Sequence, residues 1–302
     1  MRRHQHAEAW ARGAVHFALC ALVLALWPAA GSAQHNPAPH GQLFYSRLTD
    51  GTWQIWTLDL LSQEQMQLTS DEGDKRHPSW DHAGSIAYCT SNQRCFRTGL
   101  NGQGRGLLLG DLWPMKDVAW SPDGRRLAFT RFRTDLIDSA NLWLADAGGA
   151  ERRMITHEPG IQQHPAWSPD GQWIAYSAGQ GYGTYEIYVV RADGTERRRS
   201  TQNQAHEFGP AWSPDGHQIA FSSDVSGDYE IWVLDADGSN LRQLTQNPGL
   251  DTDPAWSPDG QAIAFVTNRS GTLQIWLMNP DGTDPRPLVQ QAGQPVCDPT
   301  WK

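Results

Sequence analysis

The sequence predicts an all-β fold, a six-bladed β-propeller. A tryptophan motif recurs six times, each repeat contains four short apolar runs, and no 3.6-residue apolar periodicity extends past a few residues. Four strands in a repeat of this length are typical of a propeller blade. The repeated tryptophans lie 40 to 47 residues apart, at Trp80, Trp120, Trp167, Trp212, Trp256 and Trp301.

The first 33 residues have the layout of a secretory signal peptide. A leader with three arginines precedes the apolar run Ala14–Trp27, and small residues follow up to Ala33. The apolar run is shorter than a bilayer requires, which argues against a membrane anchor. We therefore expect cleavage after Ala33, export to the periplasm, and a short linker over residues 34–41.

The two ends of the remaining chain complement one another. Three runs near the N-terminus match strands two to four of a blade: Leu43–Arg47, Gln54–Asp59 and Gln65–Thr69. The segment Asp298–Trp301 matches a first strand with no blade after it. If this strand completes the N-terminal blade, the ring closes and its sheet edges are protected. We therefore expect one propeller domain over residues 42–302.

The repeat around Trp212 shows how each blade is built. Its first run ends at Trp212, and residues 213–216, Ser-Pro-Asp-Gly, turn the chain because Pro pre-sets φ and Gly accepts a positive φ. Three further runs follow, at Gln218–Ser222, Tyr229–Leu234 and Leu241–Leu244. We expect the repeated tryptophans and the third-run aromatic residues to form the core between blades. The latter are Trp56, Phe96, Trp143, Tyr188, Trp232 and Trp276.

The recurring residues resemble the propeller repeats of the TolB family. They read Pro-Ala-Trp-Ser-Pro-Asp-Gly, then Ile-Ala-Phe, Ile-Trp-Val-Leu-Asp and Leu-Thr, and no repeat combines Gly-His with a later Trp-Asp as WD40 repeats do. The resemblance implies a periplasmic propeller that docks a cell-envelope protein similar to the peptidoglycan-associated lipoprotein. TolB has an α/β domain ahead of its propeller, and we expect none here because only residues 34–41 separate leader and first strand.

The charge balance narrows the classes of partner. The formal net charge is −9, and removal of the leader's three Arg and one Glu makes it about −11. An acidic surface repels phosphate backbones and anionic lipids. We therefore expect a soluble monomer that neither binds nucleic acid nor inserts into a membrane.

A set of polar residues at equivalent positions could form a binding site. Three residues before five of the marker tryptophans stand His77, Asp117, His164, Asp253 and Asp298, and Gly209 takes the sixth position. Because the first strands of a propeller surround its channel, these residues would form a ring near one mouth. Such a ring could bind a divalent cation or a polar ligand. Alternatively, these residues cap the loop entering each strand, since four of the five precede Pro.

Two further features leave alternatives open. Cys89 and Cys95 flank a polar turn, and they could form a disulfide in an oxidising compartment or remain two buried thiols. Cys297 is expected to be a buried small hydrophobe. The segment Arg131–Arg133 begins a long turn, which could bind a ligand or be a solvated loop.

Two classes of function follow. The first is a periplasmic, non-catalytic binding or scaffold propeller that engages a cell-envelope protein. The TolB-type repeats and the leader favour it, and the sequence contains no Gly-x-Ser-x-Gly elbow of a serine hydrolase. The alternative is a metal or polar-ligand site at the channel mouth, serving an enzyme or receptor directed at saccharides or peptides.

Overall fold

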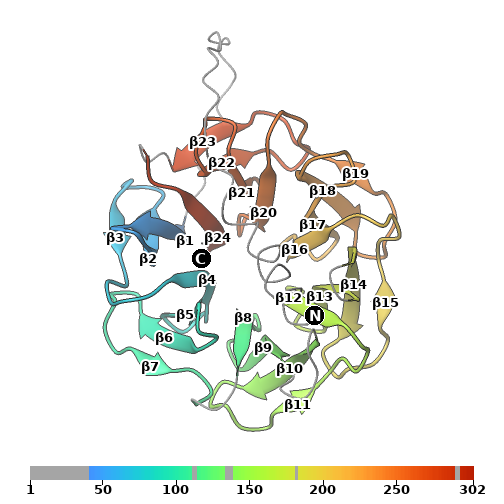
Figure 1. Cartoon of the computed structure of the whole chain (residues 1–302), viewed down its shortest axis with the longest axis horizontal. Helices are drawn as coiled ribbons and strands as arrows, with labels where there is room; N and C mark the ends of the chain where they lie inside the picture. Colours follow the sequence, from blue (N-terminus) through green and yellow to red (C-terminus); the bar gives the residue numbers. More distant parts are fainter. Residues whose placement is uncertain (1–40, 111–113, 133–138, 181–182, 290–292) are drawn as a thin grey trace, which may run out of the picture.

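The computed structural model describes residues 41–110, 114–132, 139–180, 183–289 and 293–302. These residues form β-strands and turns arranged around a central axis, which is the propeller fold that the repeats predict (Figure 1). The predicted signal peptide and the linker up to residue 40 lie outside the described residues.

The strands associate in sheets that run from the centre outwards. One sheet contains β24 (Val296–Trp301), β1 (Gln42–Thr49), β2 (Thr52–Asp59) and β3 (Gln65–Gln67). The next contains β4 (Lys75–Trp80), β5 (Ser85–Thr90), β6 (Cys95–Gly99) and β7 (Gly106–Leu107). Two more contain β16 (Glu207–Trp212), β17 (Gln218–Ser223), β18 (Glu230–Asp235) and β19 (Arg242–Gln243), and β20 (Asp251–Trp256), β21 (Ile263–Thr267), β22 (Gln274–Met278) and β23 (Arg286–Val289).

A fifth sheet has eight strands in two halves. One half contains β8 (Met115–Trp120), β9 (Arg126–Phe132), β10 (Ala140–Asp146) and β11 (Arg153–Met154). The other contains β12 (Ile161–Trp167), β13 (Trp173–Gly179), β14 (Tyr185–Arg191) and β15 (Arg198–Arg199). A single parallel pair, Ala140 with Ile161, joins β10 to β12.

The last strand of the chain pairs with the first. β24 lies antiparallel to β1, with Trp301 opposite Leu43 and Val296 opposite Arg47. It takes the innermost place in its sheet, as β4 does in the neighbouring one (Figure 1). The C-terminal strand and the first three strands therefore belong to one sheet.

The recurring Ser-Pro-Asp-Gly turn is held by its own side chains. Ser121 Oγ donates to Asp123 Oδ1 at 2.5 Å, and the same oxygen accepts the backbone N–H of Arg125 at 3.0 Å. Gly124 has φ +66°, and a Cβ there would lie 2.6 Å from the carbonyl oxygen of Asp81. Equivalent bonds recur in the turns at Ser168, Ser213 and Ser257. These repeated aspartates are therefore structural.

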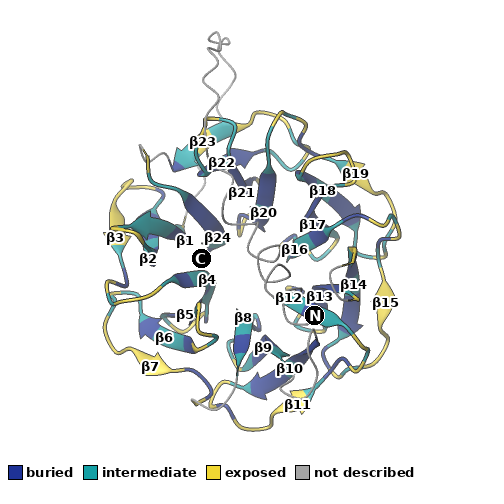
Figure 2. Cartoon of the chain, viewed as in Figure 1, coloured by how far each residue is buried: buried dark blue, intermediate teal, exposed yellow. Residues whose placement is uncertain are grey.

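The Ala-Trp pair explains how neighbouring sheets are joined. The indole N–H of Trp167 donates to the carbonyl of Ala119 in the adjoining innermost strand at 3.1 Å. The same bond links Trp212 to Ala166 and Trp301 to Ala255. Figure 2 shows burial concentrated in the inner and middle strands, whereas the outermost strands β3, β7, β15 and β19 are exposed.

The fourth strands carry two repeated devices. Just beyond each of four outer strands, a threonine accepts the backbone N–H of a third-strand residue at 2.9 Å, which accounts for the recurring Thr; these threonines are Thr69, Thr156, Thr201 and Thr245. Arginines in three outer strands donate to a backbone carbonyl in a turn of the following repeat; they are Arg153, Arg198 and Arg242. Both devices fix the outer edge where little apolar area is buried.

The cysteines are placed by the strand register. Cys89 on β5 lies opposite Cys95 on β6, and the two form a disulfide, so the structure takes the first of the two alternatives. Cys297 is buried, as expected. Within the described residues, no helix has the length and apolarity needed to cross a bilayer.

Candidate functional site

The six ring positions are β-bulges at the centre of the propeller. In each innermost strand two residues face one aromatic residue of the adjoining strand, so the register shifts by one. The first of the two is always the predicted ring residue, and φ lies between +52° and +63° at His77, Asp117, His164, Gly209, Asp253 and Asp298. A left-handed first residue defines the G1 type of bulge.

The backbone conformation explains which residue types occupy the ring. Gly has no steric barrier to positive φ, and Asp and His adopt it more readily than other side chains. The second bulge residue is usually Pro, which fits because a bulged position needs no ladder hydrogen bond. His77 is the third residue of β4, inside the strand. The alternative interpretation expected these residues to cap the loop before each strand, but they lie inside the strands and form the bulges.

Asp298 connects two sheets through its carboxylate. The oxygens accept hydrogen bonds from Arg76 Nε at 2.6 Å, from the backbone N–H of His77 at 3.2 Å and from Ser46 Oγ at 2.7 Å. Burial raises the pKa of Asp298, but Arg76, His77 and these hydrogen bonds outweigh burial and hold its pKa well below the usual range. Asp298 is therefore ionised at neutral pH.

Asp117 is the second buried carboxylate of the ring. Its Oδ2 lies 3.6 Å from Lys116 Nζ and accepts the backbone N–H of His164 at 3.4 Å. Burial alone would raise the pKa of Asp117, but Lys116, His164 and His77 lower this pKa by more than burial raises it, to about 2. Its Oδ1 is buried and accepts no hydrogen bond from the described residues.

His77 lies between these two carboxylates. Its Nδ1 is 3.6 Å from Asp298 Oδ1, and its Nε2 is 3.9 Å from Asp117 Oδ1. The His164 ring is 6.1 Å away between centroids. The His77 side chain is 41% exposed, against 4% for Asp117 and Asp298. His77 is therefore the ring residue most available to a ligand among these three.

Asp253 differs from the other two carboxylates. Its backbone N–H donates to Ser222 Oγ at 3.0 Å, and Thr252 Oγ1 donates to Oδ2 at a long 3.4 Å. No Lys or Arg of the described residues lies within ion-pair distance of it, although Arg76 and Lys116 pair with the other two. Burial, together with Asp298, raises the pKa of Asp253 to about 6 against the opposing effects of His77 and Arg76.

Aromatic residues that sequence reasoning missed lie beside the ring. The Phe208 ring packs edge-on against Tyr229 at 5.1 Å between centroids and lies 6.2 Å from His164. Phe208 and Tyr229 are both partly exposed. Phe208 directly precedes the ring position Gly209, as Arg76 precedes His77. Aligning the residue before each ring position could have revealed Phe208.

The structure thus brings the predicted ring together. His77 lies near Asp117, Asp298 and His164. Asp253 interacts electrostatically with Asp298 and His77. Among the described residues, no three His, Cys, Asp or Glu side chains are placed to hold a metal ion. The predicted metal role of the ring stays a prediction.

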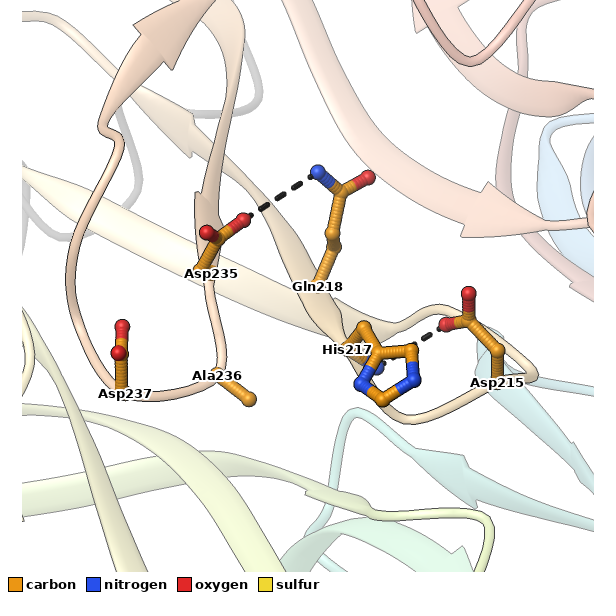
Figure 3. A pocket seen from close by; sticks show the side chains of 6 residues that line it. All are labelled: Asp215, His217, Gln218, Asp235, Ala236 and Asp237. Carbon is orange, nitrogen blue, oxygen red and sulfur yellow. Dashed lines mark hydrogen bonds between the residues drawn. The ribbon is translucent and has the colours of Figure 1, made fainter.

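A separate hollow of about 550 Å³ lies among the turns of the β16–β19 sheet (Figure 3). Its carboxylates bond within their own surroundings: Asp215 accepts the backbone N–H of His217, and Asp235 accepts Gln218 Nε2 at 3.4 Å. Its lining residues are Asp215, His217, Gln218, Asp235, Ala236 and Asp237. These local bonds account for the acidic residues without a ligand.

The basic and aromatic segment at the start of the long turn has local partners. The Arg131 guanidinium lies over the Trp143 ring, 4.5 Å from its centroid, and Lys116 Nζ lies 5.5 Å from the Phe132 centroid. Arg133 lies outside the described residues. The described part of the segment is therefore tied to neighbouring side chains.

A model of the TolB β-propeller domain family matches residues 115–206 and 187–302. The Tol-Pal system protein TolB of Anaeromyxobacter dehalogenans is 32% identical over 130 residues, which are 39% of this chain and 27% of that protein. An uncharacterized peptidase of Bacillus subtilis, YuxL, is 42% identical over 67 residues, which are 22% of this chain and 10% of that protein.

Among solved structures, TolB from Acinetobacter baumannii superposes with a TM-score of 0.73 at 21% identity. The match covers 86% of this chain and 66% of that one, and it supports the fold alone. The matched part of the chain spans about a quarter of the length of the Anaeromyxobacter protein and about a tenth of the length of the Bacillus peptidase.

Proposed function

The chain belongs to the family of the TolB β-propeller domain, and we propose that it is a periplasmic, non-catalytic propeller that binds a cell-envelope protein. The observation that carries the proposal is the channel mouth. There the exposed His77 and the partly exposed Phe208 stand on innermost strands fixed by bulges and by bonds between sheets. Binding residues on a rigid scaffold are typical of recognition surfaces.

The partner that we propose is a protein similar to the peptidoglycan-associated lipoprotein. The name of the Anaeromyxobacter relative, a Tol-Pal system protein, supports this class of partner. The acidic chain, with its formal charge of −9, favours a protein over nucleic acid or anionic lipid. We propose that the chain acts as a monomer, which light scattering on the purified protein would test.

We also propose the finer architecture expected from the repeats, six blades in a closed ring over residues 42–302. Four four-stranded sheets support it, as does an eight-stranded sheet whose halves share a single pair, and so does the pairing of β24 with β1. Residues 1–33 would be a signal peptide and 34–41 a linker. N-terminal sequencing of the exported protein should then begin at Gln34.

Direct titration tests the proposed function. The propeller, residues 34–302, is titrated calorimetrically with the purified periplasmic domain of a peptidoglycan-associated lipoprotein, and a Kd in the micromolar range or tighter is expected. The His77→Asn/His164→Asn variant of the propeller should bind at least tenfold more weakly, because Asn keeps the left-handed backbone but removes the imidazoles. The matched control variant, Asp215→Asn/Asp237→Asn in the separate hollow, should bind as tightly as the unmodified propeller. No binding by the unmodified propeller would reject the proposal.

A metal or polar-ligand site at the same mouth is a second candidate, serving an enzyme or receptor for saccharides or peptides. The buried Oδ1 of Asp117, which accepts no hydrogen bond from the described residues, favours it. The ligands would be His77, Asp117, His164, Asp253 and Asp298. Stoichiometric Mn²⁺ or Ca²⁺ retained after dialysis, and lost in the Asp253→Asn variant, would support this candidate. Retention below one tenth of an equivalent would exclude a tight metal site.

A further inference from the structure

The internal repeat allows the three ring carboxylates to be compared. Arg76 supplies a cation 2.6 Å from Asp298, and Lys116 supplies one 3.6 Å from Asp117. For Asp298 the cation is Arg76, which directly precedes the ring position His77 on the next innermost strand. For Asp117 the cation is Lys116, which directly precedes Asp117 on the same strand. The two equivalent residues near Asp253 are Thr252 and Cys297, which are neutral. Asp253 therefore lacks the cation that its counterparts have.

The ring position beside Asp253 carries no side chain. A Cβ at Gly209 would meet only Asp253 Oδ1, at 3.7 Å, which is ordinary van der Waals contact. Thr252 is short where Arg76 and Lys116 are long. Gly209, Thr252 and Asp253 together form what we term the notch. It combines a ring position without a side chain and a short neighbour with the one ring carboxylate that has no ion pair with a Lys or Arg of the described residues.

The surroundings of the notch also favour a cation. Phe208, next to Gly209, is part of the Phe208–Tyr229 aromatic pair, and aromatic faces attract ammonium and guanidinium groups. Farther round the ring, the Oδ1 of Asp117 is buried, accepts no hydrogen bond from the described residues, and faces His77 at 3.9 Å. Two ring carboxylates therefore have acceptor capacity that the described chain does not use.

We propose that the notch receives the guanidinium or ammonium group of an Arg or Lys side chain from the partner polypeptide. This inference rests on the proposed protein-binding function. A bare metal ion needs several oxygens or nitrogens converging at about 2.0 to 2.6 Å, and the ring residues do not converge in that way. An organic cation needs only one carboxylate to accept a charge-assisted hydrogen bond, and Asp253 is the ring carboxylate that has no ion pair with a Lys or Arg of the described residues.

Two substitutions change the notch without changing the bulge. Asp253→Asn removes the charge and Gly209→Asn fills the space, and Asn tolerates the left-handed φ of +52° and +63° at these positions. The matched control is Asp228→Asn, which removes one carboxylate from an exposed residue outside the ring. Thermal unfolding of each variant establishes that it is folded before binding is compared.

The first measurement uses small probes in the presence of EDTA. N-acetyl-arginine amide, which carries the cation, should bind at least tenfold more tightly than N-acetyl-citrulline amide, its neutral counterpart. Asp253→Asn and Gly209→Asn should each weaken arginine binding about tenfold, whereas Asp228→Asn should stay within twofold. Equal binding of the two probes, or arginine binding that survives both substitutions, would overturn the inference. If spermidine bound tenfold more tightly than the arginine probe, the ligand of the notch would be a small polyamine and the proposed polypeptide ligand would be rejected.

The second measurement separates this inference from the proposed function. The same three variants are titrated with the purified periplasmic domain of the peptidoglycan-associated lipoprotein. Partner binding that Asp253→Asn leaves unchanged would reject the notch and retain the proposed function. Arginine binding at the notch without any partner binding would reject the proposed partner and retain the cation site.

Discussion

Arg76 and Asp298 form an ion pair in which Arg76 Nε lies 2.6 Å from Asp298 Oδ2. The two residues are 222 positions apart in the chain. Arg76 lies on β4 and Asp298 on β24, so the pair joins the innermost strands of two sheets. Both side chains are largely shielded from water, at 18% and 4% exposure. Such a pair is costly to break, because removal of one partner leaves a buried charge.

Replacing Arg76 by Met should destabilise the protein by about 3 kcal/mol at pH 7, because Asp298 stays ionised without its cation. The folded state lowers the pKa of Asp298, so its stabilising effect exists above the pKa of the unfolded chain and is lost as pH falls below about 4. Urea unfolding at pH 7 and pH 3 measures both effects. The Arg76→Met/Asp298→Asn double variant should recover much of the stability at pH 7, and an unaltered single variant would contradict this account.

A second buried carboxylate should make stability fall as pH rises. Burial raises the pKa of Glu207 to about 7, although Thr201 and Asn203 donate hydrogen bonds to it. The folded state therefore binds the proton more tightly than the unfolded state, and stability is lost between about pH 4.5 and pH 7. We expect a loss of about 2 to 3 kcal/mol over this window.

Glu207→Gln provides the test of that titration. Gln162 takes the equivalent place in the preceding half-sheet, where its amide oxygen accepts Asn141 Nδ2 at 2.6 Å. Gln should therefore fit at position 207, reduce the loss of stability between pH 5 and pH 8, and stabilise the protein at pH 8. Asp253 and Glu230, whose pKa values burial also raises, keep part of the pH dependence in the variant. A pH profile identical to that of the unmodified protein would assign the effect to other groups.

The fold was readable from the sequence because its signals repeat. Turn chemistry fixes the strand ends wherever Ser-Pro-Asp-Gly occurs, so the runs expected around Trp212 agree with β17, β18 and β19 to within about one residue at most ends. The Leu-Thr signal was visible but could not be interpreted from the sequence, because the role of Thr245 depends on the backbone N–H of Ile231 in a different strand.

The candidate site was readable in composition but not in geometry. The positions of His77 and Asp298 follow from the spacing to the tryptophans, whereas the bulge that sets their φ near +52° depends on pairing with another strand. The charges also have long-range origins, since Arg76 neutralises a carboxylate in a different sheet. Phe208 was missed because it occupies a place where other repeats carry charged or polar residues.

The disulfide should contribute modestly to stability. Cys89 and Cys95 close a loop with a sequence separation of 6, for which chain entropy gives about 2 kcal/mol. The Cys89→Ala/Cys95→Ala variant should lose about that amount in urea unfolding. Thiol titration of the denatured, unreduced protein, residues 34–302, should find one free thiol, that of the buried Cys297. Three free thiols would show that the disulfide does not form.

The ring position of His164 separates backbone strain from ligand binding. Its φ is +54°, a region that Asn tolerates and a β-branched residue does not. His164→Asn should change the free energy of unfolding by less than about 1 kcal/mol, and His164→Val should lower it by about 2 kcal/mol or more. Thermal and urea unfolding measure this difference. Equal stability of the two variants would mean that the bulge does not select the residue type, and the two histidines and three aspartates of the ring would then need a ligand to explain them.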